Sequence, residues 1–239
     1  MKSVFLLLGL LLTANIGYAH EDILLNDGWG YRPISDPGQA VKDTPVTLPH
    51  TWNANYVTGT YYNRETMVYS RMLEVTPQMT GKRLFLYFEG VNSVADVFVN
   101  RQTVGQHKGG YTAFCLEITD YVKAGSNDLQ VWVNNAFRTD VLPISGDFNV
   151  YGGIHRPCHL IVAEQDCISP LFYASPGVLV HQKKVSQQQA EIIVETLLSL
   201  KSGKQGLRLR TSVTDRQGKV VALGETEASG NRVSQSMTI

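Results

Sequence analysis

The amino-acid sequence predicts an all-β fold, because apolar side chains recur at every second position instead of every third or fourth. Residues 84–89, 95–100 and 129–134 all alternate in this way. Turn-forming residues separate these short runs, which is typical of antiparallel β-sandwiches. No long amphipathic helix is predicted after residue 19, and the strand–helix alternation of a parallel α/β protein is missing from the sequence.

The first 19 residues have the features of a secretory signal peptide. Lys2 supplies a positive start, residues 4–12 are apolar but too few to span a bilayer, and Ala19 ends a small-residue cleavage motif. We therefore expect cleavage after Ala19 and a secreted or periplasmic protein.

Two predicted connections follow from local sequence. In the hairpin over residues 99–104, Arg101 stands where a two-residue type I′ turn favours glycine, so we expect a longer loop. In residues 107–114, two glycines permit positive φ, after which Tyr111 and Phe114 are expected to fill the core.

The strand predicted over residues 155–162 closes the first unit. Arg156, near its start, is expected to pair with a carboxylate such as Asp147 or Asp140. Residues 163–170 are polar, end in a proline and are interpreted as a connection.

A second β-sandwich is predicted beyond this connection. Residues 190–200, 207–214 and 220–221 supply alternating runs, and about four strands are visible. An immunoglobulin-type sandwich has about seven strands and about 100 residues. We therefore expect an incomplete sandwich over residues 166–239 and a sequence that is a fragment of a longer protein.

The composition argues against several function classes. The 239 residues carry a formal net charge of +0, with 18% charged and 43% hydrophobic residues. This balance lacks the basic surface expected for nucleic-acid or membrane binding, so a neutral or locally recognised ligand is favoured. Cys115, Cys158 and Cys167 are too few for a disulfide scaffold and form no zinc-ligand pattern, so no metal and no cofactor are expected.

Five motifs, in this order, resemble the N-terminal sugar-binding domain of glycoside hydrolase family 2, the β-galactosidase, β-glucuronidase and β-mannosidase group. The resemblance implies a jelly-roll sandwich over residues 20–165, followed by the incomplete immunoglobulin-like sandwich. The motifs are LPHTWN (48–53), GVNSVADVFVN (90–100), HKGGYTAF (107–114), ITDYVKAGSNDLQVWVNN (118–135) and YGGIHR (151–156).

The catalytic part of that family is not visible in this sequence. The family's two glutamates lie on a (β/α)₈ barrel, which needs about 250 residues, and the acid/base follows an asparagine. The chain has no room for a barrel and no Asn-Glu pair. We therefore expect the chain alone to be inactive, with no catalytic residue of its own.

Four residues are candidates for substrate binding. The resemblance implies that Asp147, six residues ahead of Gly153, touches the outermost sugar or a nearby cation; the alternative is a turn cap. Asn63 is a weaker candidate for the same sugar, against an ordinary loop asparagine. His50 and Trp52 are interpreted mainly as a structural corner, with a place in the pocket as the other possibility.

Three functions fit these observations. The first is the non-catalytic N-terminal portion of a secreted family 2 enzyme that hydrolyses β-linked sugars. The alternatives are a stand-alone carbohydrate-binding module and an inactive truncated product. The expected partners are a carbohydrate and the missing catalytic barrel.

Overall fold

The computed structural model describes residues 20–34, 42–55, 59, 62–144 and 148–239. Nearly all of the regular structure in these residues is β-strand, which confirms the predicted all-β fold. The helical elements are two short 3₁₀ turns, η1 (Pro77–Met79) and η2 (Thr119–Tyr121). No helix in these ranges is long and apolar enough to cross a bilayer. The predicted signal peptide lies outside the described residues.

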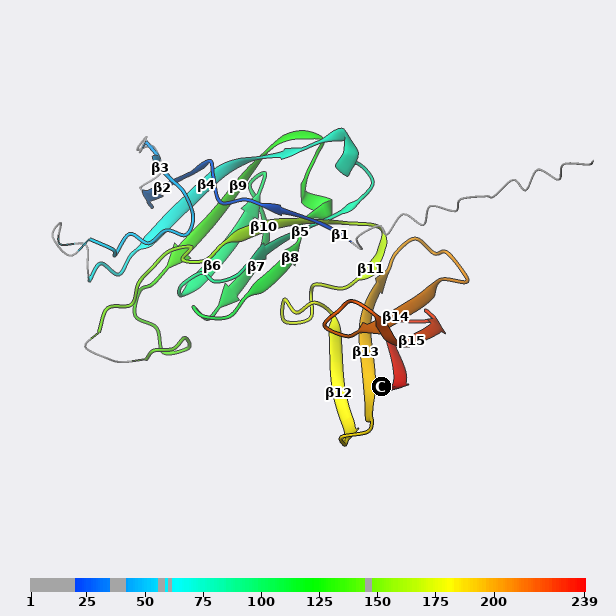
Figure 1. Cartoon of the computed structure of the whole chain (residues 1–239). Coiled ribbons are helices and arrows are strands. Elements are labelled where there is room, and N and C mark those ends of the chain that lie inside the picture. The colour runs from blue at the N-terminus through cyan, green and yellow to red at the C-terminus, as the bar shows by residue number, and fades with distance from the viewer. Residues whose placement is uncertain (1–19, 35–41, 56–58, 60–61, 145–147) are drawn as a thin grey trace, which may run out of the picture.

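Two antiparallel sheets face each other in the first part of the chain and form what we call the N-terminal sandwich (Figure 1). One sheet has the order β1-β10-β5-β8, so the first and last strands of the sandwich are neighbours. Its strands are β1 (His20–Leu24), β5 (Arg83–Phe88), β8 (Phe114–Glu117) and β10 (Cys158–Ala163). The other sheet, in the order β3-β2-β4-β9-β6-β7, contains β2 (Trp29–Pro33), β3 (Thr44–Val46), β4 (Thr66–Val75), β6 (Val94–Val99), β7 (Gln102–Lys108) and β9 (Gly125–Asn134).

The alternation of the sequence predicted correctly which strand faces are buried between the two sheets. Leu86 and Phe88 of β5 are fully buried, as are Leu129, Val131 and Val133 of β9. They belong to one continuous apolar cluster. Burial of side chains from both sheets in a single layer is the main stabilising contribution expected of such a sandwich.

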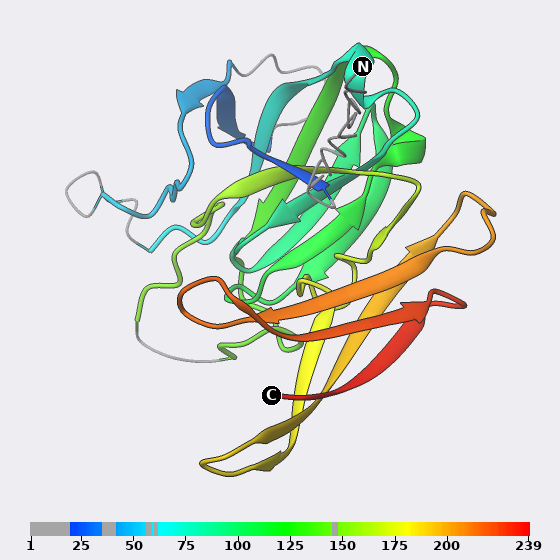
Figure 2. The same cartoon turned by 45° about the vertical axis from the view of Figure 1, so that its right-hand side comes forward.

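Six further strands form the C-terminal sheets, which lie beside the N-terminal sandwich (Figures 1 and 2). The long strand β13 pairs with β11, β12 and β16, and the β14–β15 hairpin packs against this sheet through Val213 and Ala222. The strands are β11 (Asp166–Ile168), β12 (Val178–Val185), β13 (Ala190–Leu200), β14 (Arg208–Thr214), β15 (Val220–Glu227) and β16 (Arg232–Thr238).

The polar stretch 163–170, predicted to be only a connection, contains strand β11. Cys167 is buried and packs with Phe85, Ile161 and Ala163 on the outer face of the β5–β10 sheet. The alternation within β11 was too short to be recognised. This contact joins the two parts of the chain.

A buried ion pair accompanies that contact. Arg83 is 1% exposed and its guanidinium binds both carboxylate oxygens of Glu117, at 2.8 and 2.9 Å. The same guanidinium donates to the Ser199 carbonyl oxygen at 3.3 Å and contacts the Cys167 sulfur at 3.5 Å. Lys201 also reaches Glu117, at 3.0 Å. β5 and β8 are thereby tied to β11 and β13.

The expectation of a longer loop at Arg101 was wrong. Val99 pairs directly with Gln102, so a two-residue turn joins β6 to β7, with φ of 51° at Asn100 and 65° at Arg101. The side chain of Asn100 holds this turn: its amide donates to Asn127 Oδ1 at 2.8 Å, and its oxygen accepts from the Asp128 N–H at 3.1 Å. These bonds compensate for the missing glycine.

Two further expectations were also wrong. Tyr111 is 64% exposed and lies outside the core, whereas Phe114 is buried as predicted. The last strand begins at Cys158, and Arg156 is exposed in the preceding bend. Asp140, one of its expected partners, is paired with Lys108 and Arg138.

Candidate functional site

The two most specific motifs, residues 48–53 and 151–156, form one structural unit although about 100 residues separate them. A Cβ atom on Gly152 would overlap the Trp52 ring. A Cβ on Gly153 would overlap the backbone oxygen of His50, and Gly153 has φ of 138°, which favours glycine. The double glycine is therefore needed for the close approach of these two segments.

One backbone bond and one side-chain bond hold the two segments together. The His50 N–H donates to the Ile154 carbonyl oxygen at 2.8 Å, and the Thr51 hydroxyl donates to the Gly152 carbonyl oxygen at 2.7 Å. The Leu48–Pro49 peptide bond is cis.

Three buried asparagines bind the backbone of residues 150–152, and we call them the asparagine clamp: Asn53, Asn92 and Asn135. Each is at most 2% exposed. Asn135 donates to the Val150 oxygen at 2.7 Å, Asn92 donates to the Tyr151 oxygen at 2.6 Å, and Asn53 accepts from the Gly152 N–H at 2.7 Å. An amide side chain suits this role because it can both donate to a carbonyl oxygen and accept from an N–H.

The clamp holds the backbone of residues 150–152, which follow position 147 in the sequence. Asp147 itself, the strongest of the predicted sugar contacts, lies outside the described residues, so its role stays a prediction. The described segment that follows it is held by side chains from three separate places in the sequence. Such anchoring is what a loop needs to present a side chain in a constant position.

Asn63 lies beside the clamp and contributes to it through its backbone. Its carbonyl oxygen accepts from the Asn53 amide at 2.8 Å, from the Asn135 amide at 3.1 Å and from the Trp52 indole N–H at 3.4 Å. Among the described residues, no hydrogen bond to its own side-chain amide is found. The half-buried Asn63 side chain is thus positioned near the same loop, and its contact with a sugar stays a prediction.

His50 and Trp52 have surroundings that fit the structural corner. Trp52 is 6% exposed, and its ring packs under Gly152. His50 is half-buried; its Nδ1 lies 2.7 Å from the hydroxyl of the fully buried Tyr69, and its ring lies 4.6 Å from that of Tyr31. Burial lowers the pKa of His50 and raises the pKa of Tyr69, so both groups are neutral at neutral pH. Whether either residue touches a sugar stays a prediction.

Near this loop, the structure leaves some buried polar atoms without a hydrogen-bond partner among the described residues. They are Asn92 Oδ1, Asn149 Nδ2 and His155 Nδ1. Buried polar atoms in folded proteins are nearly always paired, with protein groups or with ordered water. Burial lowers the pKa of His155, which favours a neutral imidazole there.

The sequence contained a signal for the clamp that was not recognised. Asn92 and Asn135 directly follow or interrupt apolar runs, at positions where alternation alone predicts an apolar or surface residue. Both are buried, as is Asn53. An asparagine at the end of a buried strand can satisfy the backbone of a neighbouring loop. The residue that each amide binds is set by the tertiary fold.

The described part of the chain contains no group of three or more His, Cys, Asp or Glu side chains with the arrangement of a metal site. The three cysteines are free thiols.

Comparison with known proteins gives the family context. The family model described as "Glycosyl hydrolases family 2, sugar binding domain" matches residues 35–163. Among curated proteins, a β-glucuronidase of Bacteroides fragilis is 46% identical over 89% of this chain and 31% of its own length. A β-galactosidase of Thermoanaerobacter pseudethanolicus is 32% identical over 73% of this chain and 23% of its own length.

Solved structures agree with these matches. A putative β-galactosidase from Bacteroides fragilis has a TM-score of 0.81 at 32% identity, over 93% of this chain and 35% of that chain. A Bacteroides uniformis β-glucuronidase has a TM-score of 0.83 at 28% identity, over 92% of this chain and 28% of that chain. The chain spans less than a third of the length of the two curated relatives.

Proposed function

Because the chain belongs to glycoside hydrolase family 2 and contains its sugar-binding domain, we propose that it forms the non-catalytic, sugar-recognising part of a secreted β-glycosidase. The glycosidic bond would be cleaved with retention by glutamates on a barrel supplied by the rest of that enzyme. The relatives' names favour β-glucuronides and β-galactosides as substrates.

The observation that carries this proposal is the asparagine clamp. Burying an amide is costly unless it is hydrogen-bonded, so three buried amides that all bind one short backbone segment indicate a loop whose position matters. A loop held this way can place Asp147 against a sugar, where an ionised carboxylate accepts hydrogen bonds from two hydroxyls. In this proposal Asn63 flanks the same sugar, and His50 and Trp52 support the loop from behind.

The proposal divides the chain into a sugar-binding domain over residues 20–165 and a second sandwich over residues 166–239. It also places the mature protein outside the cytoplasm, on the evidence of the signal-peptide pattern in residues 1–19. N-terminal sequencing of the exported protein tests this part. We expect a start at His20, and an exported protein that begins at Met1 would contradict it.

A chimera tests the enzymatic part. This chain replaces the corresponding N-terminal segment of the Bacteroides fragilis β-glucuronidase, and kcat/KM is measured with p-nitrophenyl β-glucuronide. We expect an active chimera and no turnover by the chain alone. Asp147→Asn in the chimera is expected to lower kcat/KM by about tenfold or more, because a hydrogen bond to a charged group is lost.

Asp120→Asn is the matched control, because Asp120 is an exposed carboxylate in η2 that takes no part in the clamp. It is expected to leave kcat/KM unchanged. A folded but inactive chimera would contradict the assignment to a β-glycosidase assembly. An active chimera that is indifferent to Asp147→Asn would remove Asp147 from the site while leaving the assembly intact.

A further inference from the structure

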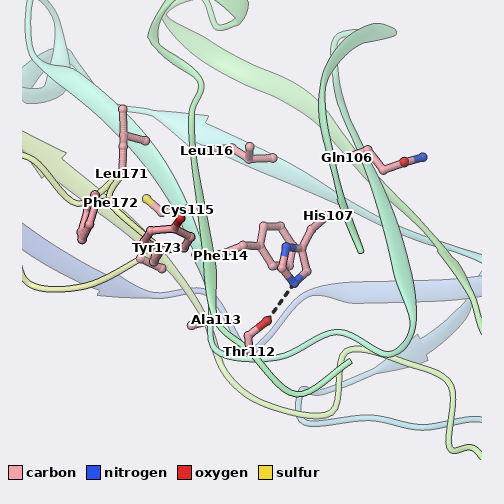
Figure 3. A pocket seen from close by; sticks show the side chains of 11 residues that line it. Gln106, His107, Thr112, Ala113, Phe114, Cys115, Leu116, Leu171, Phe172 and Tyr173 are labelled. Carbon is pink, nitrogen blue, oxygen red and sulfur yellow. Dashed lines mark hydrogen bonds between the residues drawn. The ribbon is translucent and has the colours of Figure 1, made fainter. Parts of the chain in front are cut away.

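A second concave site lies at the junction of the N-terminal sandwich and the C-terminal sheets, and it shares no residue with the clamp. It is a groove of about 760 Å³ between the β7–β8 region and the segment that precedes β12. Figure 3 shows Leu171, Phe172 and Tyr173 on one side and His107 with Thr112 on the other. The lining residues are Gln106, His107, Thr112, Ala113, Phe114, Cys115, Leu116, Leu171, Phe172, Tyr173 and Ala174.

One wall of the groove is an exposed aromatic pair on an unusual turn. Tyr173 is 86% exposed and Phe172 is 39% exposed, with their rings 4.8 Å apart in an edge-to-face arrangement. The Ser175 N–H donates to the Phe172 carbonyl oxygen at 3.0 Å and closes the turn. Tyr173 and Ala174, the central residues, have φ of 51° and 52°. Residues other than glycine rarely adopt this backbone conformation. Strained backbone positions cluster at functional sites.

The opposite wall supplies an aromatic face and polar groups. The ring of His107 stacks on Phe114, with centroids 4.3 Å apart and an interplanar angle of 12°. His107 Nε2 lies 3.3 Å from the Thr112 hydroxyl (Figure 3). Both side chains can donate or accept hydrogen bonds.

The lining of the groove contains no Asp, Glu, Lys or Arg side chain. Burial lowers the pKa of His107, which favours the neutral imidazole, and burial raises the pKa of Cys115 to about 12. Apart from the Tyr173 phenol, the other side chains that line the groove have no ionisable group. The groove therefore matches a ligand that is uncharged.

We propose that this groove is an additional carbohydrate-binding site, which holds a neutral oligosaccharide against Tyr173 and Phe172 and hydrogen-bonds it through His107 and Thr112. A sugar ring has an apolar C–H face and a rim of hydroxyls, so it needs an aromatic surface beside donors and acceptors. The groove volume falls within the range of ligand pockets. Such a site would keep a polymeric substrate attached outside the catalytic pocket.

Titration calorimetry on the full chain tests the proposal, with cellotetraose and β-1,4-galactotetraose as neutral probes and tetragalacturonate as the charged comparison. We expect saturable binding of a neutral probe, and tetragalacturonate is expected to bind no more tightly. Tyr173→Ala is expected to weaken binding by about tenfold, because the stacking surface is removed, while Tyr173→Phe keeps binding within about twofold.

Two further variants separate loss of the site from misfolding. Tyr173→Gly relieves the positive φ, so the variant is expected to lose binding while its melting temperature stays unchanged or rises. Leu223→Ala removes an exposed apolar side chain on β15, outside the groove, and is expected to bind as the parent does.

Absence of binding to both neutral probes would overturn the proposal. Binding that Tyr173→Ala leaves unchanged would overturn it as well. Sedimentation velocity tests whether a second copy of the chain occupies the groove. A dimer that Tyr173→Ala dissociates would assign the groove to that second copy and overturn the proposal. None of these results depends on Asp147 or on the chimera.

Discussion

The N-terminal sandwich and the C-terminal sheets are both antiparallel, but their cores differ greatly in size. In the N-terminal sandwich, twenty-five buried side chains form one continuous cluster within the described residues. In the C-terminal sheets, the corresponding cluster contains Ile192, Val194 and Met237. Val220, Val221 and Leu223 of β15 are between 42% and 54% exposed. The first region can be stable through its own core, whereas the second has little buried apolar surface to offset the entropy of folding.

The difference gives a specific role to the contact between the two regions. Phe85 and Ile161 are buried on the outer face of the β5–β10 sheet because Cys167 of β11 covers them. The Arg83–Glu117 pair lies at the edge of this contact. The C-terminal sheets thus gain stability from the surface of the N-terminal sandwich.

Truncation of a core side chain is expected to have the largest effect on the stability of the two regions. Leu86→Ala should lower the free energy of unfolding of the N-terminal sandwich by about 4 kcal/mol, because it opens a cavity in a fully buried site. Ile192→Ala should cost the C-terminal sheets about 2 kcal/mol, since its surroundings are less enclosed. Urea unfolding followed by tryptophan fluorescence reports on the first region alone, because Trp29, Trp52 and Trp132 all lie there.

The two variants serve as controls for each other. Ile192→Ala should leave the tryptophan transition nearly unchanged while shifting the transition followed by far-ultraviolet circular dichroism. In Ile192→Ala, a tryptophan transition that shifts as much as the circular-dichroism transition would mean that the two regions unfold as a single unit.

Loss of the buried guanidinium is expected to have a smaller effect than the Leu86→Ala cavity. Arg83→Ala leaves Glu117 without its main partner, and breaking a buried pair costs about 3 kcal/mol. The C-terminal sheets should separate from the sandwich at lower urea concentration than in the parent. Lys201→Ala is the matched control: its ammonium also binds Glu117 but is 47% exposed, so a cost below about 1 kcal/mol is expected. Equal effects of the two variants would contradict the assigned role of Arg83.

The hydrogen bonds of Glu117 also predict that the stability of the protein depends on pH, with a smaller effect than the loss of Arg83. Burial alone would raise the pKa of Glu117, but hydrogen bonds from Arg83, Lys201 and Thr119 outweigh it and lower the pKa to about 2. The unfolded chain therefore takes up the proton first, near the ordinary pKa of 4.5. Stability from this group is present above pH 4.5 and is lost as the pH falls toward 2. Melting temperatures across this range should decline less steeply in Glu117→Gln, and parallel curves for variant and parent would refute the prediction.

The inner strand faces could be predicted from the sequence because alternation reports burial directly. The outer burial of Phe85 could not, because it depends on β11, which comes some eighty residues later in the chain. Likewise, Tyr111 was expected in the core for its aromatic character, but the turn after Gly109 directs it outward, where its ring lies 6.2 Å from that of His155.

In the candidate site, too, contacts between segments far apart in the sequence could not be predicted. The motifs around His50 and Gly152 were recognised as separate features, and their mutual contact appears only when the chain is folded. Asn92 and Asn135 leave a local signal in the sequence, but the backbone groups that they bind lie elsewhere in the chain and leave none. The roles of Asp147 and Asn63 stay predictions from resemblance.

The smallest expected effect on stability comes from the two-residue turn between β6 and β7 of the N-terminal sandwich. Arg101 is exposed and has φ of 65°, which costs an L-residue about 1–2 kcal/mol, whereas glycine loses about 0.5–1 kcal/mol through its greater freedom in the unfolded chain. Arg101→Gly should therefore stabilise the N-terminal sandwich by about 0.5 kcal/mol, measured from the tryptophan transition in urea. Arg101→Ala removes the same side chain without relieving the backbone, so it should give no such gain. Equal stabilities for these two variants would show that the side-chain bonds of Asn100, and not the conformation of Arg101, determine the energy of this turn.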